Sequence, residues 1–232
     1  MILLRNILAG IFVLISVIIG IVPIILSIIF KWPKFIYFYN KFWIKMLLKI
    51  LRIKVILKNI ENIDFTKKFV LISNHLSNLD GPIIVSYLPI NIRVMIKHGA
   101  KNIPIMGKMM ETVDFVFVDR SSVRSSMKAL DDTIKMIKEK NYSFLIFPEG
   151  TRSKTGRLQK FKRGAFIIPI KANVPILPLI LKGTYELMPK ESKLIQSGKI
   201  EIEFFDFVYP DKFKDAEELE NYIIENIYKD LK

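Results

Sequence analysis

The sequence contains no cysteine and only two histidines, His75 and His98, among its 232 residues. The absence of cysteine excludes disulfide bonds, cysteine-ligated zinc and a cysteine nucleophile. With two histidines, a metal site built mainly from histidine is also excluded. A cysteine-free chain fits a globular part that faces the cytosol.

Acidic residues are missing from the first quarter of the chain. Residues 1–60 carry nine Lys or Arg and no Asp or Glu, and the net charge of the whole chain is +14. Basic, apolar segments bind anionic membrane surfaces, where each cation near the headgroups contributes about 1 kcal/mol. Nucleic acid is the other common partner of a basic protein, but no nucleic-acid-binding motif is present here. The composition therefore favours membrane lipids as partners and argues against nucleic acid.

The longest uncharged run extends from Ile7 to Phe30. As a helix it would be roughly 36 Å long, enough to cross a hydrocarbon core of about 30 Å. A signal peptide has a shorter apolar region and a small-residue cleavage site, which residues 31–34 do not provide. Pro23 predicts a kink. Two arrangements remain open for this helix: a single span and insertion into one leaflet.

The next segment, Phe35 to Ile53, predicts an amphipathic helix. Four of its cations recur at helical spacing and share one face: Lys41, Lys45, Lys49 and Arg52. The other face is apolar and aromatic, which is typical of a helix in the membrane interface; a core helix with a solvated lysine face is the alternative. We therefore expect residues 1–53 to form membrane-anchoring helices, with Lys31 and the chain beyond it on the cytoplasmic face.

Residues 54–232 alternate short apolar runs with helical patterns. Seven runs predict strands: Val55–Lys58, Phe69–Ser73, Val94–Lys97, Phe115–Val118, Ser143–Phe147, Ile176–Leu181 and Ile200–Phe207. Ser122–Lys140 and Ala216–Leu231 predict helices whose apolar stripes we assign to the core. These stripes comprise Val123, Met127, Leu130, Ile134 and Ile137, and Leu219, Tyr222, Ile223, Ile227 and Leu231. Strands separated by helices indicate an α/β domain with a mostly parallel central sheet flanked by helices.

The first chemical motif is NHLSNLD, residues 74–80, directly after a predicted strand. Loops past the carboxyl ends of strands are where α/β sheets bind ligands. On a strand-to-helix turn, His75 and Asp80 can meet. A carboxylate bound to one imidazole nitrogen leaves the other nitrogen free to accept a proton. Taken alone, such a His–Asp motif is more often a structural pair than a catalytic one.

Three further motifs follow other predicted strands or lead into them. FPEGTRS, residues 147–153, offers backbone N–H groups, a hydroxyl and a guanidinium that suit a phosphate; a plain surface turn is the alternative. Arg120, after Asp119, is expected at the same edge of the sheet as His75, where an ion pair with Asp119 or Glu149 is its structural alternative. VPILP, residues 174–178, predicts a stiff, extended entry to a strand.

Together and in this order, the four motifs resemble the glycerolipid acyltransferase family that includes bacterial 1-acyl-glycerol-3-phosphate acyltransferases. The resemblance covers roughly residues 70–180 and includes Lys97, Pro104 and Gly107 before the Asp-Arg strand. It departs at Asp114, where the family usually has glycine, and at residues 76–78, where Gln-Ser and an aromatic are common. The first departure is expected to alter the turn into the strand, and the second to tune acceptor or acyl preference.

This resemblance implies that residues 54–232 form a catalytic domain. It implies transfer of a fatty acyl chain from acyl carrier protein or coenzyme A to the sn-2 hydroxyl of 1-acyl-glycerol-3-phosphate, giving phosphatidic acid at the cytoplasmic face of the cell membrane. His75 would be the general base and Asp80 its partner. Because a thioester is already activated, no metal or other cofactor is expected. The substrate-binding candidates are Asn74, Lys97, Arg120, Glu149, Gly150, Thr151 and Arg152.

Within this set, Lys97, Arg120 and Arg152 are the candidates for the acceptor phosphate, and Glu149 is expected to bind acceptor hydroxyls or to hold the arginines. Three other interpretations stay open. A relative in the same superfamily would acylate another lysolipid or glycerol-3-phosphate itself. A non-enzymatic membrane-surface protein would keep only the fold. A serine hydrolase would use Ser73 or Ser77, although the pattern Gly-x-Ser-x-Gly is absent around both.

Overall fold

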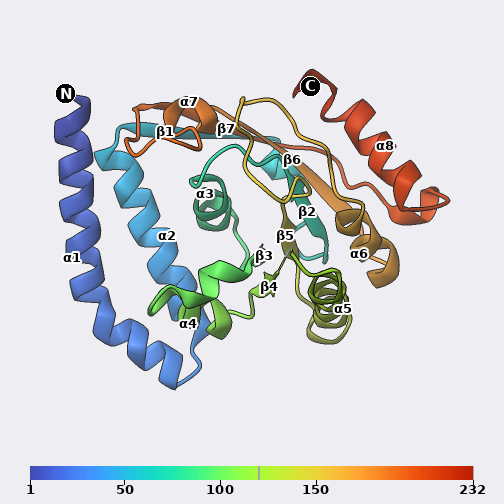
Figure 1. Ribbon diagram of the computed structural model, residues 1–232, viewed down its shortest axis with the longest axis horizontal. Helices are drawn as coiled ribbons and strands as arrows, with labels where there is room; N and C mark the ends of the chain where they lie inside the picture. Colours follow the sequence, from blue (N-terminus) through green and yellow to red (C-terminus); the bar gives the residue numbers. More distant parts are fainter. Residues whose placement is uncertain (120, 232) are drawn as a thin grey trace.

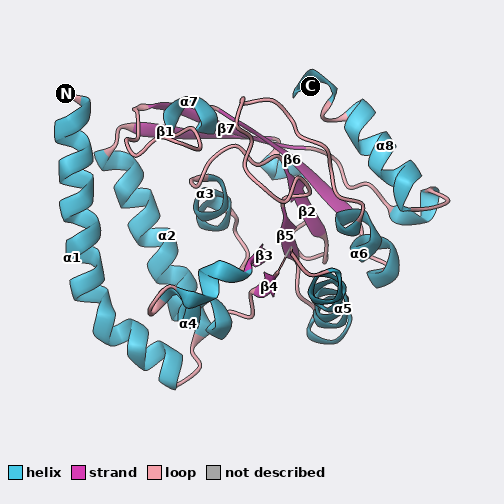
Figure 2. Ribbon diagram, in the orientation of Figure 1, coloured by secondary structure: helices cyan, strands magenta, loops and turns pink. Residues whose placement is uncertain are grey.

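The computed structural model describes residues 1–119 and 121–231. A seven-stranded sheet with the order β1-β7-β6-β2-β5-β3-β4 forms its centre (Figure 2). The strands are β1 (Ile53–Lys58), β2 (Val70–Ser73), β3 (Arg93–Lys97), β4 (Val116–Val118), β5 (Phe144–Ile146), β6 (Ile176–Lys182) and β7 (Gly198–Phe204). All pairings are parallel except that of β6 with β7. The prediction of a mostly parallel sheet is therefore confirmed, and each of the seven predicted strands is present.

The sequence of each strand fits its place in the sheet. The central strands β2 and β5 are apolar or small throughout and fully buried, as expected for parallel strands covered on both faces. In β7, Ile200 and Ile202 are buried, whereas Glu201 and Glu203 are only partly buried. This alternation is typical of a strand with one face toward solvent, and β7 is the strand that pairs antiparallel with its neighbour.

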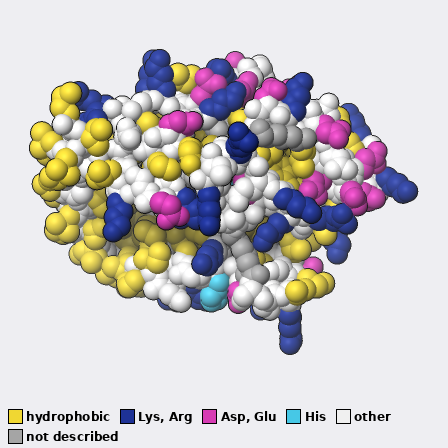
Figure 3. Space-filling view, turned by 45° about the horizontal axis from the view of Figure 1, so that its top comes forward, with side chains coloured by type: hydrophobic (Ala, Val, Ile, Leu, Met, Phe, Trp, Pro, Cys, Tyr) yellow, Lys and Arg dark blue, Asp and Glu magenta, His cyan; other side chains and the backbone are white. Residues whose placement is uncertain are grey.

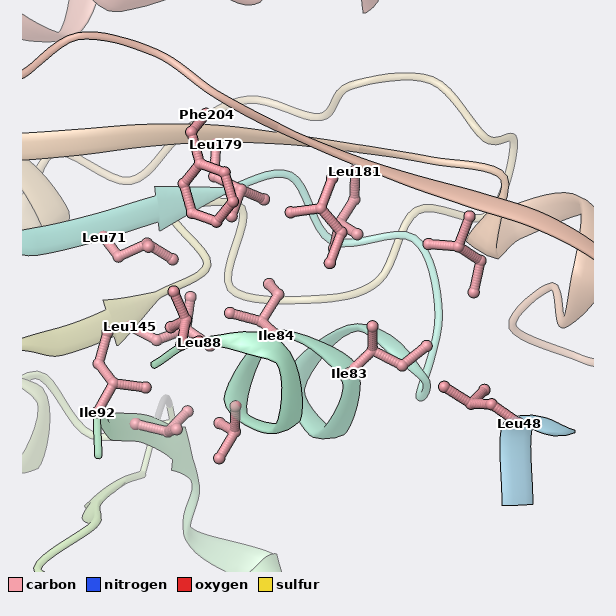
Figure 4. Packing of buried hydrophobic residues seen from close by; sticks show 14 of the residues in the cluster. Leu48, Leu71, Ile83, Ile84, Leu88, Ile92, Leu145, Leu179, Leu181 and Phe204 are labelled. Carbon is pink, nitrogen blue, oxygen red and sulfur yellow. The ribbon is translucent and has the colours of Figure 1, made fainter. Parts of the chain in front are cut away.

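Helices cover both faces of the sheet (Figure 1). They are α1 (Ile2–Ile29), α2 (Pro33–Ile50), α3 (Asp80–Tyr87), α4 (Met106–Thr112), α5 (Val123–Lys140), α6 (Gly164–Ala172), α7 (Thr184–Leu187) and α8 (Ala216–Asn226). On one face, α3 packs against Leu71 and Leu145 of the sheet (Figure 4). On the other face, α5, α6 and α8 pack against Val70, Ile72 and Phe144. Successive residues of β2 thus contribute to two separate cores.

Two details of the predicted helices differ from the structure. Val123 and Met127 are exposed, because the line of α5 that faces the core runs through Ala129, Thr133 and Ile137. The predicted helix over 216–231 ends at Asn226 and is followed by a short 3-10 helix, Lys229–Leu231. Tyr222 is also exposed, since α8 buries only Leu219 and Ile223 in its own span. The assignment of both whole stripes to the core was therefore wrong at these positions.

α1 and α2 form an antiparallel pair at one side of the molecule (Figure 1). The face of α1 that meets α2 carries small residues, including Ser16 and Gly20, and these allow the aromatic rings of α2 to approach closely. Phe12 contacts Trp43 with ring centroids 4.9 Å apart, and the Tyr39 hydroxyl donates to the Ser16 carbonyl. Figure 1 shows the axis of α1 bending in its last third, the part that contains the predicted kink.

The outer face of α1 is apolar and exposed along its length. It is the one helix among residues 1–119 and 121–231 that is long and apolar enough to cross a membrane. Figure 3 shows hydrophobic side chains gathered on the side of the molecule that α1 forms. The helix is also tied to the α/β part: the Asn6 side chain donates to the Ile195 carbonyl (2.9 Å) and accepts from the Ile195 N–H (2.8 Å). α1 therefore lies along the domain instead of projecting away from it.

Candidate active site

The His–Asp pair predicted from the first motif is formed. The loop after β2 carries His75, α3 begins at Asp80, and His75 Nδ1 lies 2.8 Å from Asp80 Oδ2. The same oxygen accepts from the backbone N–H groups of Leu76 (2.7 Å) and Ser77 (2.8 Å). Asp80 is fully buried, whereas the His75 ring is partly exposed. An ionised Asp80 holds the proton on Nδ1 and leaves the lone pair on Nε2 available to a substrate.

The PEGTRS loop holds the His75 backbone from both sides. Glu149 Oε1 accepts from the His75 N–H (2.6 Å), and the Ser153 N–H donates to the His75 carbonyl (2.8 Å). The Phe147 ring stacks on the imidazole, with centroids 4.1 Å apart and an angle of 20° between the planes. Two motifs that lie about 70 residues apart in the chain thus build one rigid unit around the imidazole.

Glu149 has a different environment from the one expected. Its side chain is buried, and its second oxygen accepts from the backbone N–H (3.0 Å) and the side-chain amide (3.1 Å) of Gln159. Burial raises the pKa of the Glu149 carboxyl above its ordinary value, against the hydrogen bonds from His75 and Gln159, which lower it. Among residues 1–119 and 121–231 the carboxylate forms no ion pair with an arginine. The contacts of Glu149 are therefore those of a residue that holds the loops of His75 and Gln159 in shape.

The Asn74 side chain also forms its hydrogen bonds with the backbone. Its amide donates to the Leu181 carbonyl (2.9 Å) and accepts from the Leu181 N–H (2.8 Å), and the side chain is buried. These two bonds continue the pairing of β2 with β6 past the end of the strand. Asn74 therefore positions the loop that carries His75 through one donor and one acceptor of its amide.

The remaining candidates lie around the same edge of the sheet. Gly150 has a φ of +71°, where a Cβ would lie 3.0 Å from Lys162. Arg152 donates to the Lys190 carbonyl (3.3 Å), and Lys190 Nζ lies 3.5 Å from the Thr151 hydroxyl. These contacts gather cationic side chains beside the PEGTRS loop.

Lys97, one of the candidates for the acceptor phosphate, lies on a strand farther along the sheet. Lys97 ends β3, which is separated from β2 by β5 in the sheet, and its side chain is exposed. Arg120 lies outside the described residues. Within the described part of the chain, no group of three or more His, Asp or Glu side chains lies close enough together to hold a metal ion.

An apolar cavity of about 240 Å³ is lined in part by Phe147, the residue whose ring stacks on His75. Side chains of β3, β4, β5, α5 and α6 line it, among them Met95, Val118, Leu130, Ile146 and Ile168. Residues 150–185, which include the loop at the mouth of the cavity, contain eight Lys or Arg and no Asp or Glu. The site therefore combines a proton acceptor, an apolar cavity and a positively charged surround.

Three residues that hold His75 or the Glu149 side chain in place were not among the predicted ones. Phe147 and Ser153 lie inside the FPEGTRS motif, so their position in the motif was the available signal. Gln159 lies outside any motif, and its bonds to Glu149 depend on how the following loop folds back. No pattern in the sequence marks such a contact.

Comparison with known proteins identifies the family. Residues 54–182 match the family described as acyltransferase. A 1-acyl-sn-glycerol-3-phosphate acyltransferase of Cocos nucifera is 31% identical over 73% of this chain and 54% of its own length. One of Borreliella burgdorferi is 32% identical over 61% of this chain and 56% of its own. The match thus spans only about half the length of these curated relatives.

A solved structure supports the same assignment. The crystal structure of the 1-acyl-sn-glycerophosphate (LPA) acyltransferase PlsC from Thermotoga maritima superposes with a TM-score of 0.80 and 26% identity. The likeness covers 98% of this chain and 96% of that one. The resemblance drawn from the four motifs is therefore confirmed. The chain belongs to the acyltransferase family, and among its members it is similar to the 1-acyl-sn-glycerol-3-phosphate acyltransferases.

Proposed function

We propose that the protein transfers a fatty acyl chain from a thioester to the sn-2 hydroxyl of 1-acyl-glycerol-3-phosphate, giving phosphatidic acid. The observation that carries this proposal is the His75–Asp80 pair, whose Nε2 is left free at the edge of the sheet. The comparisons support the reaction class, and the names of the curated relatives support the acceptor.

In the proposed reaction, His75 Nε2 takes the proton from the acceptor hydroxyl as its oxygen attacks the thioester carbonyl. Asp80 stabilises the imidazolium that forms. The tetrahedral intermediate then expels the thiolate, and the proton on Nε2 passes to the leaving sulfur, which regenerates the neutral imidazole. The substrate hydroxyl is the nucleophile, so no acyl-enzyme forms and neither Ser73 nor Ser77 is needed.

The surroundings of His75 suit the two substrates. The apolar cavity beside Phe147 would receive a fatty acyl chain, because burial of each methylene contributes about 0.8 kcal/mol. Arg152 and Lys190, with Lys97 and Arg120 as predicted from the motifs, would bind the acceptor phosphate. The donor would be acyl carrier protein or coenzyme A. The acidic surface of the carrier protein and the phosphates of coenzyme A would each match the basic loop over residues 150–163.

We further propose that the protein lies on the cytoplasmic face of the cell membrane with α1 in one leaflet. α1 carries its exposed apolar face along the side of the domain, and the bonds of Asn6 to Ile195 hold its N-terminal end against a surface loop. A helix that crossed the bilayer would carry one of its ends away from that domain. In one leaflet, the site meets a lysophospholipid at the headgroup level.

The test is incorporation of labelled acyl chain from acyl-coenzyme A and acyl carrier protein into 1-acyl-glycerol-3-phosphate by the purified protein in vesicles. We expect His75→Ala to lower the rate about 10²–10⁴-fold. His98→Ala is the matched control, because His98 is the other histidine and is exposed. Equal rates for wild type and His75→Ala, with both proteins folded, would overturn the proposed mechanism.

A second candidate is acylation of a different lysolipid or of glycerol-3-phosphate. The departures from the family at Leu76 and Asn78 favour it, since they lie in the loop that carries His75. The same assay with a panel of acceptors separates the candidates. No product with 1-acyl-glycerol-3-phosphate, but product with another lysolipid that His75→Ala abolishes, would establish the second candidate.

A further inference from the structure

A short segment between β3 and α4 presents apolar side chains to solvent. Ile103 and Met106 are 45% and 47% exposed, and Pro104 between them is exposed as well. α4, which begins at Met106, contacts α1. The segment therefore adjoins the helix whose outer apolar face we place in the bilayer.

The backbone of this segment is held in a defined shape. Ile105 has φ and ψ of +63° and −52°, an unfavourable conformation for a β-branched residue that persists only where surrounding contacts impose it. The Gly107 N–H donates to the Ile103 carbonyl (2.8 Å). A Cβ at Gly107 would lie 2.0 Å from the Lys101 carbonyl oxygen, so this close approach requires glycine. The two exposed side chains are thus displayed by a built turn.

The charges around the segment match an anionic lipid surface. Lys101 and Lys108 flank the apolar side chains, and both pair with the single acid Glu111, at 3.0 and 2.7 Å. The cluster keeps a net positive charge. Cations beside apolar residues are typical of segments that lie at the headgroup boundary, with the apolar side chains below it.

We propose that residues 103–106 form a second membrane-inserted element, which places Ile103 and Met106 among the lipid acyl chains beside α1. This proposal rests on the proposed membrane placement of α1. Its consequence is that the domain contacts the bilayer at two separate places, the outer face of α1 and this turn. Two contacts fix the tilt of the domain, and with it the height of the carboxyl end of β3 above the lipid.

The absence of cysteine allows a direct test by single-site labelling. Ile103→Cys and Met106→Cys, each carrying an environment-sensitive fluorophore, are mixed with vesicles of phosphatidylcholine and phosphatidylglycerol that contain quenchers on the acyl chains. Leu14→Cys, on the exposed face of α1 and 61% exposed, is the positive control. Tyr222→Cys, 42% exposed on α8 at the opposite end of the molecule (Figure 1), is the negative control.

We expect quenching at positions 103, 106 and 14 and none at 222. Quenching at 14 without quenching at 103 and 106 would overturn the insertion of residues 103–106 while leaving the membrane placement of α1 intact. No quenching at 14 would overturn both. A fluorescence change at 103 and 106 that needs no vesicles and grows with protein concentration would mean that a second copy of the chain covers the turn, which also overturns the proposal.

Binding to the same vesicles gives an independent measurement. We expect Ile103→Ser/Met106→Ser to lower partitioning onto vesicles at least on the order of tenfold, since two apolar side chains no longer enter the lipid. Tyr222→Ser should leave partitioning unchanged, and thermal melting checks that each variant folds. Unchanged partitioning of a folded double variant would contradict the proposal.

Discussion

At the scale of single residues, the hydrogen bonds to one oxygen of Asp80 organise most of the site. Asp80 Oδ2 accepts from the His75 ring and from two backbone N–H groups, while Oδ1 is buried without a hydrogen-bond partner among the described residues. The carboxylate therefore both orients the imidazole and shapes the loop. These two roles can be separated by substitution.

Asp80→Asn keeps an oxygen that can accept the three hydrogen bonds but removes the negative charge that stabilises the imidazolium. We expect the acyl-transfer rate to fall about 10²–10⁴-fold with a small change in melting temperature. Asp80→Ala removes the hydrogen bonds as well, so both the rate and the melting temperature should fall. A rate for Asp80→Asn close to that of wild type would contradict the proposed role of the charge.

Glu149 is expected to make the stability of the protein depend on pH. Burial raises the pKa of its carboxyl above 4.5, so the folded protein binds this proton more tightly than the unfolded chain. Protonated Glu149 therefore contributes stability below about pH 4.5, and that contribution is lost as the pH rises through the folded-state pKa. Glu149→Gln cannot titrate and serves as the reference.

We expect the free energy of unfolding of wild type, relative to Glu149→Gln, to decrease as the pH rises above 4.5 and then to level off. Denaturant unfolding at a series of pH values measures this difference. A difference that stays constant with pH would show that the Glu149 pKa is the same in the folded and unfolded states.

Asp114 shows how a departure from the family can be accommodated. Its φ is +58°, in the left-handed region that glycine tolerates best. Aspartate tolerates this region better than most residues, and here its carboxylate accepts from the Tyr142 hydroxyl (3.0 Å) and pairs with Lys140 (3.4 Å). Asp114 thus adopts a backbone conformation that glycine favours and adds side-chain contacts at a position where the family usually has glycine.

At the scale of elements, the α1–α2 pair depends on the small residues of α1. Gly20 lies where a Cβ would clash with the Tyr39 hydroxyl at 2.0 Å, whereas at Gly10 no atom lies within 4 Å of a Cβ. Gly20 is thus closely packed and Gly10 is not, although both lie on α1. The difference makes them a matched pair for testing how tightly the helices pack.

We expect Gly20→Leu to destabilise the protein by about 1–3 kcal/mol, because the added side chain forces α1 away from α2. Gly10→Leu should change stability by much less. Thermal unfolding in detergent measures both. Equal effects of the two substitutions would mean that α1 and α2 are not packed as described.

At the scale of the whole molecule, the C-terminal segment is joined to the strands that carry the site. Tyr228 is fully buried, and its hydroxyl lies 2.8 Å from the carbonyl oxygens of Ile72 in β2 and Leu179 in β6. The Leu231 carbonyl accepts from the Leu158 N–H in the loop that follows PEGTRS (2.9 Å). The end of the chain thus supports both the strand before His75 and the loop that holds Glu149.

Tyr228→Phe keeps the ring but leaves the two carbonyl groups without their hydroxyl donor. We expect a loss of about 1–3 kcal/mol in the free energy of unfolding, measured by chemical denaturation, together with a reduced acyl-transfer rate. Tyr222→Phe is the control, because its hydroxyl is on the exposed side of α8. Unchanged stability of Tyr228→Phe would contradict a supporting role for this hydroxyl.

Local patterns were sufficient to identify the parts of this protein. The uncharged run over 7–30, the seven apolar runs and the five-residue spacing of His75 and Asp80 depend on neighbours in the chain, and helix and strand periods follow from those neighbours. The order of four motifs also identified the family, because each motif is a contiguous stretch of the sequence.

Contacts between distant segments depended on packing instead. The Glu149 carboxylate faces the backbone of a residue 74 positions away, and α5 turns Val123 outward although its apolar stripe predicts burial. The turn that carries Ile103 and Met106 likewise includes a close approach of Gly107 to Lys101 that no sequence pattern marks. Spacing along the chain specifies which face of an element a residue occupies, but the partner of that face is chosen when the layers of the whole domain close-pack around the sheet.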